Sequence, residues 1–260
     1  MPLPVDLVHR ELGGAGQPPL ILLHGLLGSS RNWQTAGRDL AARFHVFALD
    51  LRNHGSSPHS PGMEWDALEA DVLAWMDRQE IVEATLLGHS LGGKVAMRLA
   101  CRNPARVSRL IVVDIAPKAY LSRAHRAEFA AMTELDLGTL ESRAMAELRF
   151  EARVPDWSMR KFLTTNLERT DEGGWRWTIP LALLTEALPV LETNSLADRD
   201  RFNGPVVFVV GGRSRYVLES DHAAIRTHFP RAQFVVMDEA GHNPHMETRE
   251  TFVRTVLDTL

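Results

Sequence analysis

Short apolar runs recur along the chain, and amphipathic stretches separate them. The runs are rich in Val, Ile and Leu, and they occupy residues 5–12, 20–23, 45–49, 84–87, 110–113, 206–210 and 234–237. Because apolar residues fill successive positions and not only alternate ones, each run is typical of a strand that is buried on both faces of a mostly parallel sheet.

The stretches between the runs carry apolar residues at helical spacing. The clearest example places Trp65, Leu68, Val72, Trp75 and Met76 on one face of a helix, mostly three or four positions apart. A regular alternation of strand and helix predicts βαβ units. We therefore expect an α/β fold, with a mostly parallel central sheet flanked by helices.

The alternation stops after Pro117 and resumes near Asn203. Residues 118–202 have mainly helical patterns, so we expect a helical cap inserted between two core strands, with residues 1–117 and 203–260 forming the core. Large apolar residues at helical spacing usually pack internally. We expect this of most of the set Phe129, Met132, Met145, Leu148, Phe150, Trp157, Met159 and Phe162. Trp175 and Trp177 lie in the part without helical pattern, and we predict that they contact the substrate.

Composition and charge disfavour several classes of protein. With 260 residues, 45% of them hydrophobic, the chain can bury a large core. Its net charge is −4 and its arginines lie among acidic residues, so we expect no nucleic-acid partner. No stretch reaches the roughly 18 apolar residues that span a bilayer, and residues 1–16 lack the pattern of a secretion signal. We expect a soluble, cytoplasmic protein without membrane insertion, and the sequence leaves its oligomeric state open.

The cysteine and histidine content gives no sign of a disulfide or a metal site. Cys101 is the only cysteine, so no intramolecular disulfide can form, and we expect it to pack as a small side chain. The 11 histidines include no HExxH pair, and their spacing does not match that of metal ligands. We expect neither a metal nor another cofactor.

A Gly-His-Ser-Leu-Gly motif at residues 88–92 follows one of the apolar runs and precedes a helical pattern. A serine at a sharp strand-to-helix turn is the nucleophile elbow of serine hydrolases. The glycines relieve the crowding of the turn, while the serine takes up a strained backbone conformation. We identify Ser90 as the candidate nucleophile.

A serine hydroxyl needs a base within hydrogen-bond reach, and a carboxylate must hold that base in one tautomer. His242 is the candidate base. It follows Gly241 in the loop after the last apolar run, before a helix that we expect near Glu247.

The acid partner of the base is not found at its most common position in the chain. In the common triad arrangement the acid follows the strand after the cap, but the loop after residues 206–210 carries Ser214 where an aspartate is expected. Asp114 directly follows the run at 110–113, at the carboxyl edge where open α/β sheets build their sites, and it preserves the chain order Ser, Asp, His. We identify Asp114 as the acid, with Ser214 hydrogen-bonded near the Asp114–His242 pair. The alternatives, should Asp114 prove dispensable, are Asp198, Asp200, Glu219 and Asp221.

Residues 24–28 read His-Gly-Leu-Leu-Gly after the apolar run at 20–23 and have the form of an oxyanion loop. Acyl transfer develops negative charge on the carbonyl oxygen, so two preorganised backbone donors are needed. We assign this role to the amides of Leu26 and Leu91. Further candidates for the substrate pocket are His24, His89 and Tyr216.

These motifs, in this order, resemble the α/β-hydrolase superfamily over nearly the full length of the chain. Residues 50–57 (DLRNHGSS), 87–97 (LGHSLGGKVAM) and 114–117 (DIAP) narrow the resemblance to the YbfF-type bacterial esterases and their mitochondrial relatives. In that group the resemblance implies an α/β-hydrolase fold and a Ser-Asp-His triad whose acid follows the strand before the cap. It also implies a serine in the usual acid position, which matches Asp114 and Ser214.

The motifs predict a serine carboxylesterase that hydrolyses small-molecule esters with short to medium acyl chains through an acyl-enzyme, and acyl thioesters would use the same groups. Two other classes stay open, because fold does not fix function. One is a lyase, carbon–carbon bond hydrolase or perhydrolase with the same triad, and the other is a non-catalytic ligand-binding homologue. Epoxide hydrolase and dehalogenase chemistry is disfavoured, since their nucleophile is an aspartate.

Overall fold

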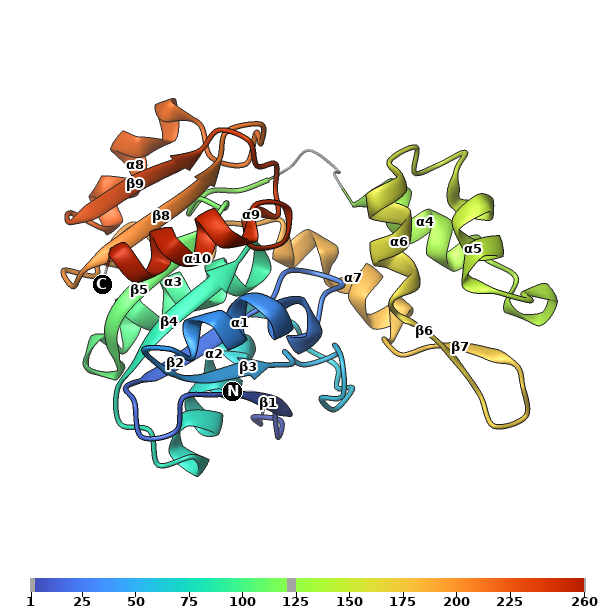
Figure 1. Cartoon of the computed structure of the whole chain (residues 1–260), viewed down its shortest axis with the longest axis horizontal. Helices are drawn as coiled ribbons and strands as arrows, with labels where there is room; N and C mark the ends of the chain where they lie inside the picture. The colour runs from blue at the N-terminus through green and yellow to red at the C-terminus, as the bar shows by residue number, and fades with distance from the viewer. Residues whose placement is uncertain (1–2, 121–124, 260) are drawn as a thin grey trace.

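The computed structural model describes residues 3–120 and 125–259, and a seven-stranded sheet forms the centre of this part of the chain (Figure 1). The strands, in the order in which they lie in the sheet, are β1 (His9–Gly13), β3 (His45–Leu49), β2 (Pro19–Leu23), β4 (Ala84–His89), β5 (Val107–Val113), β8 (Val206–Gly211) and β9 (Ala232–Met237). β1 runs antiparallel to β3, and the other neighbouring strands pair in parallel. The predicted α/β fold with a mostly parallel central sheet is confirmed.

The first strand is shorter than the apolar pattern suggested, because it begins at His9 and not at Val5. The Val5 amide donates to the Asp71 carboxylate at 2.8 Å, and the Val8 amide donates to the Ser57 hydroxyl at 2.8 Å. Since side chains take up these two amides, the strand begins only at His9, although the Val8 carbonyl still accepts from the Asp50 amide at 2.8 Å.

Helices cover both faces of the sheet. They are α1 (Gln34–Leu40), α2 (Trp65–Arg78), α3 (Leu91–Arg102), α8 (His222–His228), α9 (Pro244–Glu247) and α10 (Arg249–Asp258). Neighbouring residues of a strand point to opposite faces, so Leu20 and Leu22 of β2 pack in one cluster with α1 and α10. Ile21 and Leu23 pack in a second cluster with α2, α3 and α8. This alternation explains why the strands are apolar at successive positions.

The segment between β5 and β8 forms further helices and a hairpin, and Figure 1 shows it projecting to one side of the sheet. Its elements are α4 (Arg126–Glu134), α5 (Arg143–Phe150), α6 (Trp157–Thr164), β6 (Leu167–Arg169), β7 (Trp175–Trp177) and α7 (Leu181–Leu191). They lie within the segment predicted as the cap, residues 118–202, and we keep that name for it. Short 3-10 turns are η1 (Ser30–Trp33), η2 (Pro104–Arg106), η3 (Leu137–Thr139) and η4 (Glu219–Asp221).

Side chains of α2 and α3 hold the end of the cap. Trp65 Nε1 donates to Thr193 Oγ1 at 2.9 Å, and Lys94 Nζ donates to the Thr193 carbonyl at 2.6 Å. Arg98 Nη1 donates to the Ser195 carbonyl at 2.7 Å. The C-terminal end of the cap is therefore fixed against α2 and α3, and α3 is the helix that follows Ser90.

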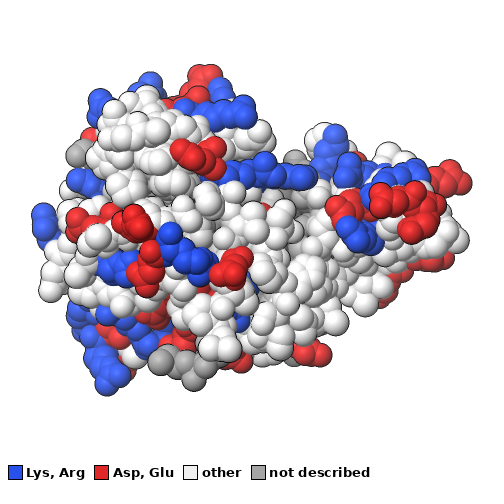
Figure 2. Space-filling model, turned by 90° about the horizontal axis from the view of Figure 1, so that it is seen from below, with Lys and Arg blue, Asp and Glu red and all other residues white. Residues whose placement is uncertain are grey.

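Charged side chains are mixed on the surface. Figure 2 shows Lys and Arg lying among Asp and Glu over both the core and the cap on the face in view. Within residues 3–120 and 125–259, no helix is both long enough and apolar enough to cross a bilayer. Cys101 is half-buried, and burial raises the pKa of its thiol to about 12.

A buried ion pair joins the loop after β3 to α2. The side chains of Arg52 and Asp71 are 0% and 1% exposed, and Arg52 Nη2 donates to Asp71 Oδ1 at 2.6 Å. Arg52 Nη1 also donates to the Gly62 carbonyl at 2.7 Å. The carboxylate offsets the cost of burying the guanidinium, so removing either partner alone leaves an uncompensated charge in the core.

We expect Asp71→Ala to lower the free energy of unfolding by about 3–5 kcal/mol, because Arg52 loses its buried partner. Asp77→Ala in the same helix removes an exposed pair with Arg106 and should cost no more than about 1 kcal/mol. Urea denaturation of the two variants measures both values. Equal losses in the two variants would contradict the role assigned to the buried pair.

Candidate active site

Ser90 lies at a strained turn between β4 and α3. Its φ of 51° and ψ of −116° lie outside the regions that residues with side chains normally adopt. A Cβ on Gly88 would lie 2.3 Å from the Gly92 carbonyl oxygen, and a Cβ on Gly92 would lie 2.4 Å from the Leu23 carbonyl oxygen. Both glycines are therefore needed for α3 to start directly against β2 and β4.

Asp114 follows β5 directly and is fully buried. Its φ of 50° is left-handed, a conformation that aspartate tolerates better than most residues. The Gly211 amide donates to Asp114 Oδ1 at 3.0 Å, and the Ser214 hydroxyl donates to Oδ2. Oδ2 also lies 2.8 Å from His242 Nδ1. The fold thus brings Asp114, Ser214 and His242 together from three segments that are distant in sequence.

The contact with Asp114 sets the tautomer of His242. A carboxylate only accepts hydrogen bonds, so Nδ1 of His242 donates and Nε2 keeps its lone pair. The Tyr216 ring stacks on the His242 ring, with ring centres 3.8 Å apart and planes at 16°. His89 Nε2 donates to the His242 carbonyl at 2.8 Å. Contacts from β4, β5 and the loop after β8 therefore all fix the candidate base.

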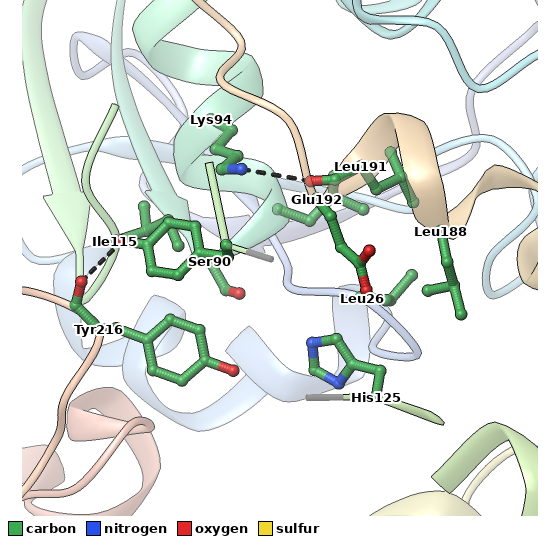
Figure 3. Close-up of a pocket in the computed structure, with 11 residues that line it drawn as sticks. Leu26, Ser90, Lys94, Ile115, His125, Leu188, Leu191, Glu192 and Tyr216 are labelled. Carbon is green, nitrogen blue, oxygen red and sulfur yellow. Dashed lines mark hydrogen bonds between the residues drawn. The ribbon is translucent and has the colours of Figure 1, made fainter. Parts of the chain in front are cut away.

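Ser90 opens onto a pocket between the core and the cap. The apolar side chains that line it are Leu26, Leu91, Ile115, Leu188 and Leu191. The polar side chains that line it, besides Ser90, are Lys94, Tyr120, His125, Glu192 and Tyr216. Figure 3 shows the Tyr216 hydroxyl, the His125 ring and the Glu192 carboxylate turned toward the space beside Ser90.

Lys94 lines this pocket one helical turn after Ser90. Its Nζ donates to the carbonyls of Leu191 at 3.2 Å and Thr193 at 2.6 Å. Burial lowers the pKa of Lys94 to about 7, against a smaller opposing effect of the Glu192 carboxylate. Sequence reasoning missed this lysine, although its position four residues after the nucleophile, on the same helix face, could have identified it.

His125 and Glu192 reach the pocket from the cap. Burial lowers the pKa of His125 to about 4, His242 lowers it further, and Glu192 opposes this shift. Arg126 pairs with Glu192 at 3.2 Å. No pattern in the sequence indicates these residues, because their place at the site depends on how the cap docks on the core.

The loop at residues 24–28 presents the Leu26 amide at the pocket. The Gly25 carbonyl accepts hydrogen bonds from His24 Nδ1 at 2.8 Å and from the Gly28 amide at 3.0 Å. Because a trans peptide unit points its N–H opposite to its C=O, the Leu26 amide is directed away from these two donors. Leu91 begins α3, so its amide lacks a carbonyl partner one turn earlier in the helix.

Two histidines that we predicted for the pocket lie behind it and do not line it. His24 Nε2 accepts a hydrogen bond from the Leu51 amide at 3.0 Å, and its Nδ1 donates to the Gly25 carbonyl. His89 holds the carbonyl of His242. Both imidazole rings form hydrogen bonds with backbone groups of the loops around the site. Among the side chains that we predicted for the pocket, Tyr216 does line it.

Trp175 and Trp177 also lie outside the pocket lining. The Arg169 guanidinium lies 4.7 Å from the centre of the Trp175 ring, and the Trp177 ring stacks with that of Phe150 at 6.5 Å between centres. The hairpin turns both indoles toward residues of the cap, whereas α7 supplies the pocket wall. The expectation that these tryptophans contact the substrate stays a prediction, and the structure places neither of them in the lining of the pocket beside Ser90.

Four buried histidines close to the site are held neutral. Burial is the largest cause in each case, and it lowers the pKa of His54 and that of His245 to about 3. The pKa values of His24 and His89 are lowered as well. In the described part of the chain, no group of three or more His, Cys, Asp and Glu side chains is placed to hold a metal ion.

We expect the protein to lose stability as the pH falls from about 6.5 to about 3. In this window the unfolded chain binds protons on these histidines and the folded chain does not, because their folded pKa values lie below the ordinary value of 6.5. Urea unfolding at a series of pH values measures the slope. His245→Phe keeps a ring against Trp33 and should flatten the slope, whereas His59→Gln at an exposed position should not. A slope that His245→Phe leaves unchanged would rule out this contribution.

Residues 18–248 match the family model described as alpha/beta hydrolase fold. The chain is 35% identical to the sn-1-specific diacylglycerol lipase ABHD11 of Mus musculus, over 99% of this chain and 86% of that protein. It is 32% identical to the esterase YbfF of Escherichia coli, over 92% of this chain and 91% of that protein.

A solved structure, a marine microorganism esterase, superposes with a TM-score of 0.95 at 31% identity, covering 98% of this chain and all of that one. A second, E-2-(acetamidomethylene)succinate hydrolase, shares the fold with a TM-score of 0.81 at 24% identity, covering 97% of this chain and 94% of that one. The chain therefore belongs to the alpha/beta hydrolase family, and it is a carboxylic ester hydrolase of the serine hydrolase type.

Proposed function

We propose that the chain hydrolyses carboxylic esters with Ser90 as nucleophile, His242 as general base and Asp114 as the acid of the triad. The observation that carries the proposal is the 2.8 Å contact between Asp114 Oδ2 and His242 Nδ1 at the sheet edge where the strained elbow presents Ser90. This contact leaves His242 Nε2 as the nitrogen that can take a proton.

The reaction has two halves. Ser90 Oγ bonds to the acyl carbon while its proton passes to His242 Nε2, and the carbonyl oxygen becomes an oxyanion. The intermediate then breaks its bond to the alcohol oxygen or the thiol sulfur, and His242 returns the proton to this leaving group. Water repeats the sequence on the acyl-enzyme, releasing the carboxylic acid and restoring the Ser90 hydroxyl.

The amides of Leu26 and Leu91 serve as the oxyanion donors in this proposal. The Leu26 amide lies in the loop at residues 24–28, and the Leu91 amide begins α3. Because the fold already fixes both segments, little reorganisation is needed as the charge develops. Asp114 stabilises the His242 imidazolium through the bond to Nδ1, and Ser214 keeps the Asp114 carboxylate in place by donating to Oδ2.

The pocket supports an ester or thioester with a short to medium apolar acyl chain. Leucine and isoleucine side chains form one part of its wall, and burying an apolar chain against them contributes about 0.8 kcal/mol per methylene group. The E. coli relative is named an esterase and the mouse relative a diacylglycerol lipase. Simple acyl esters, acyl thioesters and acylglycerols of matched chain length therefore form the set of substrates to screen.

We expect Asp114→Asn to reduce the esterase kcat by about 10⁴-fold, because an amide holds the imidazole in the wrong tautomer. Asp221→Asn removes a carboxylate that pairs with Lys118 outside the triad, and it should leave kcat within a few-fold of the parent value. Steady-state kinetics on an aryl ester measure both. A near-normal rate in Asp114→Asn would move the acid to another residue.

Labelling of Ser90 separates the competing classes of function. A fluorophosphonate should modify the parent protein at Ser90 and should not modify Ser90→Ala. Absence of labelling would favour a non-catalytic ligand-binding homologue. Labelling combined with slow ester turnover and fast cleavage of a carbon–carbon bond next to a carbonyl would favour the lyase or carbon–carbon hydrolase class.

The pocket wall gives a second test of the substrate class. We expect Leu188→Trp to lower kcat/KM for octanoyl esters by about tenfold or more relative to acetyl esters, because the larger ring fills space that a longer chain needs. Leu148→Trp, on the exposed face of α5, provides the matched control. A preference unchanged by Leu188→Trp would place the acyl chain elsewhere.

A further inference from the structure

The loop that carries Leu26 is clamped between the core and the cap. Leu27, the next residue, is buried and has a left-handed φ of 61°. Its amide donates to His54 Nε2 at 3.1 Å, and its carbonyl accepts from Asn166 Nδ2 at 3.0 Å. His54 belongs to the core and Asn166 to the cap, and both side chains are buried.

These two contacts help to fix the loop that carries the Leu26 amide. A left-handed leucine is strained, and it persists only where the surroundings hold it. The His54 and Asn166 contacts fix the peptide units on both sides of Leu27, while the Gly25 carbonyl is fixed by its own two donors. The Gly28 amide, one of those two donors, shares a peptide unit with the Leu27 carbonyl, and the Leu26 amide shares a peptide unit with the Gly25 carbonyl. Release of the Asn166 contact therefore loosens the Gly28 amide and, through it, the peptide unit that carries the Leu26 amide.

The core anchor belongs to the loop after β3. His54 Nδ1 donates to the Arg52 carbonyl at 2.8 Å, so Nε2 is the nitrogen that accepts from the Leu27 amide. The ring is fully buried and uncharged, and burial lowers the pKa of His54 to about 3. Both hydrogen bonds of this ring are to core residues, so no cap residue takes a direct part in this anchor.

The cap anchor depends on how the cap is docked. Asn166 lies between α6 and β6, and its carbonyl accepts from the Thr178 amide at 2.8 Å and from Thr178 Oγ1 at 3.2 Å. The backbone amide of Asn166 donates to the Leu163 carbonyl at 3.2 Å. The backbone of Asn166 is thus fixed to the cap, and its side chain spans the gap to the oxyanion loop.

We propose that Asn166 is a positioning residue through which the docked cap holds the Leu26 amide in the oxyanion hole. The inference rests on the proposed function, since it assigns the Leu26 amide to the oxyanion. Asn166 does not line the pocket with Ser90, so it acts through the Leu27 carbonyl and not by touching substrate. The cap then contributes to transition-state stabilisation in addition to forming a pocket wall.

The test compares Asn166→Asp with Thr193→Val in the full-length protein. Asn166→Asp keeps the shape of the side chain and removes the donor to Leu27. Thr193→Val removes a different contact between core and cap, the one from Trp65 Nε1, and leaves the oxyanion loop untouched. Thermal unfolding and titration of active sites with a fluorophosphonate correct for any loss of folded enzyme.

We expect kcat of Asn166→Asp to fall by about tenfold or more, short of the roughly 100-fold to 1000-fold loss that removal of a whole oxyanion donor causes. KM should change little. An alkyl trifluoromethyl ketone, which adds to Ser90 and places an oxyanion in the hole, should bind more weakly by the same factor as kcat/KM falls. The corresponding alkyl alcohol, which carries no oxyanion, should bind equally well to both proteins.

Two results would overturn the inference while leaving the proposed function intact. One is a kcat in Asn166→Asp equal to that of Thr193→Val. The other is a loss that appears in KM and in alcohol binding as strongly as in kcat. Failure of the parent protein to react at Ser90 with the fluorophosphonate would instead overturn the proposed function and the inference together.

Discussion

The buried carboxylate of Asp114 connects the ends of three strands. It lies directly after β5, and it accepts hydrogen bonds from Gly211 at the end of β8, from Ser214 after β8 and from His242 after β9. A buried carboxylate without such partners would be costly, so the site is satisfied only when these loops have reached their final positions. The bonds that orient the candidate base are the same bonds that join the carboxyl ends of the strands.

The cap adds a second constraint to this sheet edge. Its last helix lies over the pocket, and Lys94 donates to the carbonyls at the end of that helix from one turn beyond Ser90. Asn166 of the cap donates to the Leu27 carbonyl in the loop that carries Leu26. The geometry of the pocket therefore depends on two separate contacts between cap and core, one near Ser90 and one near Leu26.

Much of the fold could be predicted from the sequence, because strands buried on both faces leave continuous apolar runs. The positions of Ser90 and Asp114 could be predicted for a similar reason, since the motif at residues 88–92 and Asp114 each directly follow such a run. The residues that line the pocket could not be predicted in this way. Trp175 and Trp177 were chosen as large rings outside helical patterns, yet they pack against the cap, whereas His125 and Glu192 reach the pocket through the docking of the cap. Local periodicity records which face of an element is buried, but not which element covers it.

The place of the candidate acid, after β5 and not after β8, follows from the sheet order. β5 and β8 are neighbours, with Val113 opposite Val209, and the Asp114 amide continues this pairing by donating to the Val209 carbonyl at 2.9 Å. A side chain at the end of either strand can therefore reach the same point beside His242. Here Asp114 supplies the carboxylate and Ser214 supplies a hydroxyl that donates to it. If serine stood at position 114 and aspartate at position 214, a hydroxyl and a carboxylate would still meet at this point. The carboxylate can therefore follow either β5 or β8 without a change in the fold.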